Sequence, residues 1–127
     1  MDITYLLFSF QGRIRRLHYW LTAIGAAVVV GIIGSVLLGM SGLATGHMNP
    51  IIALPLIVIY VIDIWIGLAL GVKRCHDRDK SGWFLLIGLI PIIGPIWLLV
   101  ELGFLDGTPG PNKFGASPKG IGGPALA

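Results

Sequence analysis

Residues 17–62 read LHYWLTAIGAAVVVGIIGSVLLGMSGLATGHMNPIIALPLIVIYVI and contain no Asp, Glu, Lys or Arg. A bilayer core of about 30 Å needs about 20 helical residues, so this uncharged run is too long for one span and long enough for two. The break falls in residues 41–50, where Gly, Asn and Pro are typical of a turn. We therefore expect membrane-spanning helices over residues 19–40 and 51–72.

A third apolar segment follows over residues 83–105, and Ser81 before it is a suitable N-cap. Its centre reads IPIIGP (90–95), where Pro95 would remove a helical hydrogen bond. A kinked third crossing is our prediction. The alternative is a re-entrant hairpin, which would return the chain to the side it left; its freed backbone groups would then need protein or water as partners.

The two ends of the chain differ from these apolar runs. Ile3, Leu6, Leu7 and Phe10 recur at helical spacing, which predicts a short amphipathic helix on the membrane surface over residues 2–10. Residues 106–127 are rich in Gly and Pro and should be irregular. The predicted fold is thus an all-α integral membrane protein, with one membrane domain over residues 1–105, about three spans and an irregular tail.

Composition supports this class. Of the 127 residues, 55% are hydrophobic and 12% are charged, whereas a soluble domain has about 25% charged residues. The net charge of +3 is gathered in short clusters beside apolar runs, a pattern typical of topology signals rather than of a nucleic-acid-binding face. The single cysteine, Cys75, excludes a disulfide within the chain.

The basic clusters predict the orientation. Three arginines precede the first span, four basic residues lie between the second and third segments, and the loop over residues 41–50 has none. Both clusters then share one side, and the positive-inside rule places that side and the N-terminus in the cytoplasm of a multi-pass plasma-membrane protein. Three crossings would put Lys113 and Lys119 outside, which the same rule disfavours.

Small residues form a stripe along the first span. Close approach of two helix backbones in lipid requires such residues. We expect this stripe to be a helix–helix interface, within the chain or between chains; it comprises Ala23, Ala27, Gly31, Ser35 and Gly39, with Gly67 and Gly71 at the same spacing in the second span.

One acidic residue lies within a predicted span. Asp63 is near the middle of the second span, where a charge costs from about 3 kcal/mol upward. It could be a proton- or ion-coupled site. Alternatively, it is a protonated carboxyl hydrogen-bonded to a neighbouring helix, or the span is shifted so that water reaches it.

The charged stretch over residues 73–80 offers a second candidate. His76 and Asp77 could be an acid/base pair or the start of a metal site, but neighbouring residues in a loop are a weak metal pattern. We favour a hydrogen-bonded turn in which Asp77 pairs with Arg74 or a backbone amide. The basic residues of both clusters could bind a phosphate or only orient the chain.

Catalytic signatures are absent from the sequence. There is no Walker-type loop, no Gly-x-Ser-x-Gly, no His-Glu-x-x-His and no cysteine pair. We therefore predict no catalytic residue, no cofactor and no metal site.

Three stretches together resemble a known family. Residues 10–20, FQGRIRRLHYW, resemble the F-x-G-R-x-x-R-x-x-Y-W opening of the YhaH-like bacterial inner-membrane proteins, catalogued as domain of unknown function 805. Residues 74–83, RCHDRDKSGW, are similar to its R-x-H-D-x-x-x-S-G-W motif. Residues 107–115, GTPGPNKFG, with Pro118 beyond, look like its G-T-x-G-x-N-x-Y-G-x-x-P ending, with Phe114 in place of Tyr.

The resemblance implies a small polytopic protein of the bacterial inner membrane without an established activity. It gives no catalytic assignment. It does single out a set of residues that composition alone would treat as topology and turn residues: Gly12, Arg13, Arg16, Arg74, His76, Asp77, Ser81, Trp83 and Asn112.

The predicted function is a non-enzymatic membrane adaptor or binding module with a basic cytoplasmic face. Its expected partners are the bilayer, anionic lipid headgroups, and a second copy of the chain or another membrane protein, but not nucleic acid. Two alternatives stay open: a transporter or channel component using Asp63, and an enzyme acting on an anionic lipid or metabolite through His76 and Asp77. The candidates for anion or lipid binding are Arg13, Arg16, Arg74, His76, Asp77, Arg78 and Asn112.

Overall fold

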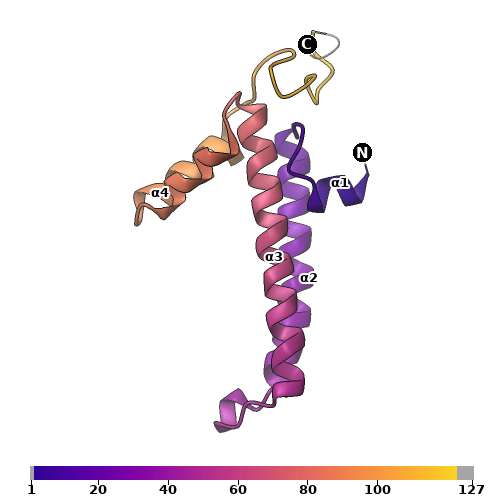
Figure 1. Cartoon of the computed structure of the whole chain (residues 1–127), viewed down its shortest axis with the longest axis vertical. Helices are drawn as coiled ribbons and strands as arrows, with labels where there is room; N and C mark the ends of the chain where they lie inside the picture. Colours follow the sequence, from indigo (N-terminus) through magenta and orange to yellow (C-terminus); the bar gives the residue numbers. More distant parts are fainter. Residues whose placement is uncertain (1, 123–127) are drawn as a thin grey trace.

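The computed structural model describes residues 2–122, and its regular structure there is entirely helical. Two long helices, α2 (Arg16–Met40) and α3 (Pro50–Asp77), run side by side as a stem (Figure 1). The short helix α1 (Ile3–Phe8) lies across one end of this stem, and the loop at the other end contains the single turn η1 (Leu43–Thr45). The predicted N-terminal helix therefore forms.

The two stem helices have the length and composition of membrane spans. They contain 25 and 28 residues, or about 38 and 42 Å at 1.5 Å per residue, which exceeds a bilayer core of about 30 Å. Both are apolar enough to cross a membrane. Most of their large apolar side chains face outward, and the buried apolar cluster consists of Ile14, Ile66 and Leu70. Lipid, rather than a protein core, accounts for so much exposed apolar surface.

The helix α3 begins and ends at recognisable signals. The side chain of Asn49 accepts a hydrogen bond from the Ile51 amide at 3.0 Å, and proline occupies the first helical position. At the other end, α3 continues through Asp77 and stops before Asp79, whose φ is 60°. Residues 73–77 are therefore helical, which corrects the predicted loop over residues 73–80. The helix can continue because its charged side chains find partners there.

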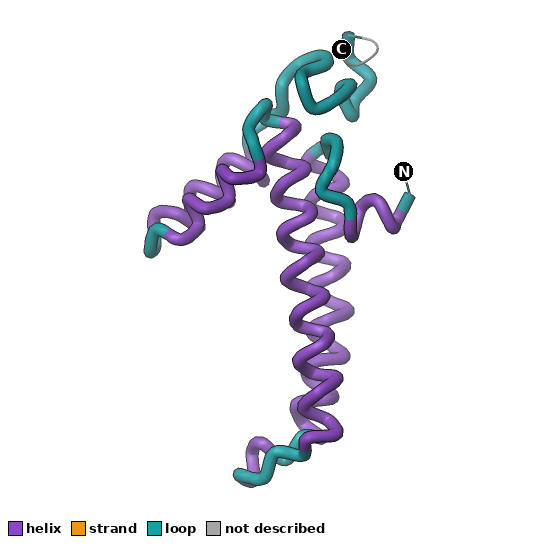
Figure 2. Tube along the Cα trace, viewed as in Figure 1, coloured by secondary structure: helices purple, strands orange, loops and turns teal. Residues whose placement is uncertain are grey.

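Residues 83–105 do not form the continuous helix we expected. Ser81 does cap the segment, accepting a hydrogen bond from the Trp83 amide. The chain then forms η2 (Gly82–Leu89), turns at residues 90–92 where Ile92 has φ 67°, and returns through α4 (Ile93–Leu98) and η3 (Leu99–Phe104). The alternative geometry, a hairpin, is the one observed, and both of its ends lie at the same end of the stem (Figure 2).

Sequence features of the hairpin explain where it turns. Pro95 is the third residue of α4, where an amide would lack a helical partner in any case, so it does not break the helix. Gly94 allows the two arms to cross closely, because a Cβ there would overlap the carbonyl of Ile87. The break thus lies before the proline that we expected to cause it.

Most of the small-residue stripe on α2 lies away from the contact between the stem helices, although Ala23 packs against the cluster of Ile14, Ile66 and Leu70. Ala27, Gly31, Ser35 and Gly39 are exposed, whereas Val30 and Gly34, on the neighbouring face of α2, are buried. The stripe stays a prediction as an interface between chains.

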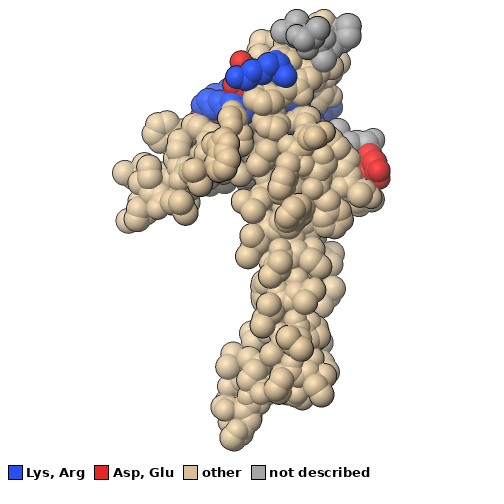
Figure 3. Space-filling view, viewed as in Figure 1, with Lys and Arg blue, Asp and Glu red and all other residues tan. Residues whose placement is uncertain are grey.

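Basic residues gather at one end of the molecule (Figure 3). All nine Lys and Arg lie before or at the start of α2, at or just after the end of α3, or in the tail that the hairpin brings back to this end. The loop at the opposite end contains none of them.

Candidate functional site: a polar head built from three motifs

The basic end forms a compact unit, here called the polar head: residues 11–16, 73–80 and 105–120. These three segments contain most of the residues that carry the family resemblance. They are far apart in the sequence, and two buried arginines join them.

Arg74 connects the head to the hairpin. Its side chain is fully buried, and its Nε donates to the carbonyl of Leu102 at 2.7 Å. Its two terminal nitrogens donate to the carbonyls of Ile14 at 3.0 Å and Leu105 at 2.8 Å. It also forms an ion pair with Asp77, one helical turn further along α3. Arg74 thereby fixes the chain before α2 and the end of the hairpin to α3.

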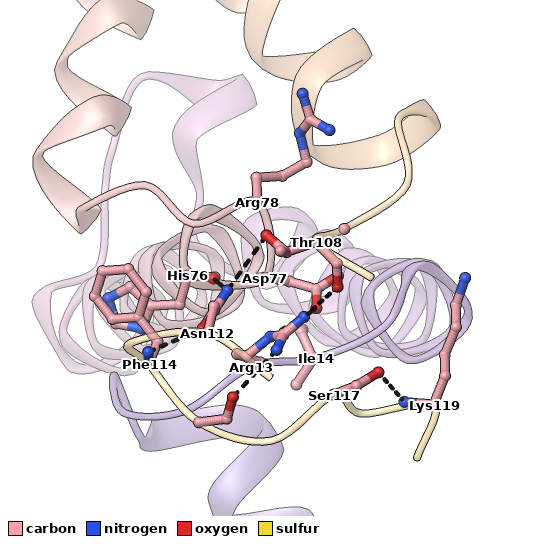
Figure 4. Close-up of polar contacts among 12 residues, drawn as sticks. Arg13, Ile14, His76, Asp77, Arg78, Thr108, Asn112, Phe114, Ser117 and Lys119 are labelled. Carbon is pink, nitrogen blue, oxygen red and sulfur yellow. Dashed lines mark hydrogen bonds and ion pairs between the residues drawn. The ribbon is translucent and has the colours of Figure 1, made fainter. Parts of the chain in front are cut away.

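Arg13 makes the equivalent connection to the tail (Figure 4). Its Nε donates to Oδ1 of Asp77 at 3.0 Å. Its terminal nitrogens donate to the carbonyls of Thr108 at 2.8 Å, Gly110 at 2.9 Å and Gly115 at 3.2 Å. The planar guanidinium group suits such multiple contacts. The tail therefore wraps around this one side chain.

Asp77 lies between the two arginines and is buried. One of its carboxylate oxygens pairs with Arg13 and the other with Arg74. Its backbone carbonyl accepts a hydrogen bond from the Thr108 amide at 2.6 Å. Gly107 passes so close that a Cβ there would overlap the carboxylate. Burying charges is tolerable only when they are paired and hydrogen-bonded, as these are.

His76 and Asn112 hold the tail turn. The Asn112 amide nitrogen donates to the carbonyl of His76 at 3.0 Å, and its oxygen accepts from the Phe114 amide at 2.8 Å. The ring of Phe114 stacks on the His76 ring, with centroids 4.1 Å apart. Nδ1 of His76 lies 2.9 Å from the carbonyl of Gly12, so Nδ1 bears the proton in this contact. The Phe in place of the family's Tyr keeps the stacking surface.

A second group of ion pairs lies at the edge of the head. Glu101, from the returning arm of the hairpin, pairs with Arg78 at 3.1 Å and with Lys80. Arg16 donates to the carbonyl of Phe104 at 2.7 Å. Asp106, at the surface, accepts from Lys119 at 2.6 Å, and this hydrogen bond lowers the pKa of the carboxyl below its usual value.

The head thus brings together six of the eight predicted site residues. Five are joined by hydrogen bonds or ion pairs among themselves or through the shared turn: Arg13, Arg74, His76, Asp77 and Asn112. The sixth, Arg78, is held through Glu101 of the hairpin. Arg16 lies beside them on the hairpin end. Asp63 is apart, 14 residues before Asp77 on α3, or about 21 Å along the axis. Within the described residues, no group of three His, Cys, Asp or Glu side chains could hold a metal ion.

Two connecting residues were not among our candidates. Lys73 is buried, and its Nζ donates to the carbonyls of Tyr5 and Leu6 at the end of α1. Glu101 is likewise buried, and it accepts hydrogen bonds from Arg78 and Lys80. Both are charged residues at or inside an apolar segment, and this alone indicates that each needs a partner.

The fold and the head define a small helical membrane protein whose basic end is organised by buried arginines. The model of the family described as Protein of unknown function (DUF805) matches residues 7–116. The inner membrane protein YhaH of Escherichia coli (strain K12) is 37% identical, over 87% of this chain and 88% of its own length. YhaI of the same organism is 34% identical, over 87% and 86%, and the uncharacterized protein YiiR is 31% identical, over 91% and 89%.

No solved structure matches significantly. The chain belongs to the DUF805 family, and its relatives YhaH and YhaI are inner membrane proteins.

Proposed function

We propose that this chain is a non-enzymatic membrane adaptor, a binding module that presents the polar head at the cytoplasmic face of the inner membrane. The observation that carries the proposal is that the charged motif residues are buried and contact one another. Arg13, Arg74 and Asp77 are 5%, 0% and 3% exposed, and they contact one another and backbone carbonyls. Such residues shape a surface instead of facing a substrate.

The proposed topology has two crossings, α2 and α3, and a re-entrant hairpin, so that both the N-terminus and the tail are cytoplasmic. The position of the nine basic residues at one end supports it, because basic residues in short segments are retained on the cytoplasmic side. The hairpin also removes the conflict that Lys113 and Lys119 pose for three crossings.

Within the candidate set for anion binding, the structure favours a division of roles. Arg16 and Arg78 keep 42% and 26% of their side chains exposed, and they are placed to meet lipid headgroups. Arg13, Arg74, His76, Asp77 and Asn112 act by holding the head together. A cavity of about 230 Å³ beside Asp77 and Thr108, bordered by Lys119, is a candidate contact point for a partner.

The geometry gives less support to an enzyme. An acid/base pair needs a free carboxylate and a free imidazole nitrogen near a substrate. Here both oxygens of Asp77 are paired with arginines, and the ring of His76 is stacked against Phe114. Unchanged lipid and metabolite profiles after His76→Ala would agree with this assignment.

A photoreactive amino acid in place of exposed Lys113 tests the adaptor role in intact cells. We expect one discrete crosslinked protein, and the same probe at Ala44 in the opposite loop should not capture it. Gly107→Ala should reduce the adduct at least tenfold, because its Cβ would displace the tail from Asp77. Gly39→Ala is the matched control, since a Cβ there meets nothing within 4 Å.

Two results would contradict the adaptor role. One is the absence of any adduct at Lys113. The other is an adduct that persists in Gly107→Ala while limited proteolysis shows that the tail has been released.

Asp63 supports a second candidate, a proton- or ion-coupled transporter component. It lies at the middle of α3, partly buried, and it makes no hydrogen bond or ion pair within the described residues. A carboxyl kept at that depth without a partner is costly. This candidate predicts that Asp63→Asn changes proton or ion flux in liposomes at least tenfold while leaving the melting temperature within a few degrees. Equal flux in the two proteins would exclude it.

A further inference from the structure

A large groove lies beneath α1, where α1 meets the two stem helices. Its volume is about 590 Å³, and its lining comes from α1, α2 and α3, for example Leu6, Val29 and Ile62. Apart from His18 and Thr22, every lining residue is apolar or glycine. A hollow of this composition is suited to a hydrocarbon chain rather than to a polar metabolite.

The groove is a built feature, because α1 is fixed over it by hydrogen bonds. Buried Lys73 donates to the carbonyls of Tyr5 and Leu6, the latter at 2.7 Å. Trp65 donates from Nε1 to the carbonyl of Phe8 at 3.1 Å. These contacts satisfy carbonyls at the C-terminal end of a helix of six residues. The anchored helix therefore forms one wall of the groove.

The length of the groove matches one leaflet of a bilayer. Along α2 its lining runs from His18 to Val30, a rise of about 18 Å. Half of a hydrocarbon core of about 30 Å is about 15 Å. The groove thus follows the stem from its basic end to about the middle of the membrane.

At the basic end of the groove lie polar side-chain groups that have no hydrogen-bond partner among the described residues. Nδ1 of His18 is buried and has no hydrogen-bond partner in the described part of the chain. Arg15 is the N-cap residue of α2, and His18 lies in the first turn of that helix, so both are at the basic end of the stem. Between residues 2 and 122, the Arg15 side chain makes no hydrogen bond or ion pair. The other four arginines all donate to protein groups.

We propose that this groove binds one anionic phospholipid from the leaflet at the basic end, with an acyl chain beneath α1 and the phosphate at Arg15 and His18. The length, the apolar lining and the two unpaired basic side chains each fit one part of such a molecule. The residues that line the groove lie outside the polar head, so the lipid site does not depend on the adaptor role.

The test uses the full chain in nanodiscs of equal phosphatidylglycerol and phosphatidylethanolamine, analysed by native mass spectrometry. We expect one phosphatidylglycerol to stay bound to the wild-type protein. Gly25 lines the groove, and a Cβ there meets nothing within 4 Å. Gly25→Leu should therefore fill the groove without a clash and reduce the lipid-bound fraction at least tenfold. Gly39→Leu is the control, with equal space on the same helix outside the groove.

A second pair of variants tests the headgroup contact. Arg15→Gln should lower the ratio of bound phosphatidylglycerol to phosphatidylethanolamine about fivefold, the factor expected from one basic residue near anionic lipid. Lys113→Gln removes a charge of the same sign from the head and should leave the ratio unchanged.

Three outcomes would overturn the proposal: no lipid retained by the wild type, equal retention by Gly25→Leu, or equal loss in Gly39→Leu. An unchanged ratio in Arg15→Gln would overturn the assignment of the phosphate. The adaptor crosslinks at Lys113 should persist in Gly25→Leu, so failure of either proposal can be recognised separately.

Discussion

Replacing Arg74 with alanine is expected to destabilise the protein by about 3–5 kcal/mol, the usual cost of leaving a buried charge without its partner. The change would remove the donors to Leu102, Ile14 and Leu105 and would leave Asp77 with one arginine. Thermal unfolding in mild detergent measures the loss. Limited proteolysis should show faster cleavage in residues 105–120 than in the wild type.

Two matched variants separate the geometry of Arg74 from its charge. Arg74→Lys keeps the charge but cannot reach three carbonyls at once, so it should lose most of the same stability. Arg78→Ala removes an arginine from the partly exposed edge of the head, where an ion pair is worth about 1 kcal/mol or less. A loss below about 1 kcal/mol in Arg74→Ala would contradict the role assigned to this side chain.

The side of the membrane on which the tail lies can be measured by thiol labelling, and we expect an all-or-none difference between two positions. In a protein with Cys75→Ser, a new cysteine at Lys113 should resist a membrane-impermeant thiol reagent in intact cells and react once the membrane is opened. A new cysteine at Ala44, in the loop between α2 and α3, should react in intact cells. The physical reason is that the hairpin returns the tail to the end where the nine basic residues lie.

Labelling at Lys113 from outside would require a third crossing and would separate the tail from the arginines that hold it in this structure. The Ala44 position is the control for access of the reagent. Protection at both positions would contradict the two-crossing topology.

The sequence predicted the helical class well because its signals are local. An uncharged run longer than one span, a break rich in Gly, Asn and Pro, and the Ser81 cap all act within a few residues. The residues over 19–40 and 51–72 are helical as expected, within α2 and α3, although α3 continues to Asp77. Charge suggested a loop there, and only the tertiary partners of Lys73, Arg74 and Asp77 allow the helix to extend.

The polar head could be predicted only in part because its contacts are long-range. The carbonyls that accept from Arg13 lie 95 to 102 residues away, and no side-chain pattern marks a backbone carbonyl as a partner. One usable signal was Glu101, an acid alone in an apolar segment. Its need for a cation would have favoured the hairpin over the crossing that we predicted, because Glu101 pairs with Arg78 and Lys80.

The wrapping of the tail around Arg13 also determines when, during synthesis, the polar head can fold. Arg13 leaves the ribosome before its partners Thr108, Gly110 and Gly115, which follow it by 95 to 102 residues. Until the tail has been synthesised, Arg13 and Asp77 must therefore remain hydrated at the membrane surface, where they can contact other molecules. A chain interrupted before residue 108 would keep its stem but could not close its head, and quality-control proteases would meet unprotected charged segments. Closure of the head therefore requires synthesis to have passed residue 115, the last of the three partners of Arg13.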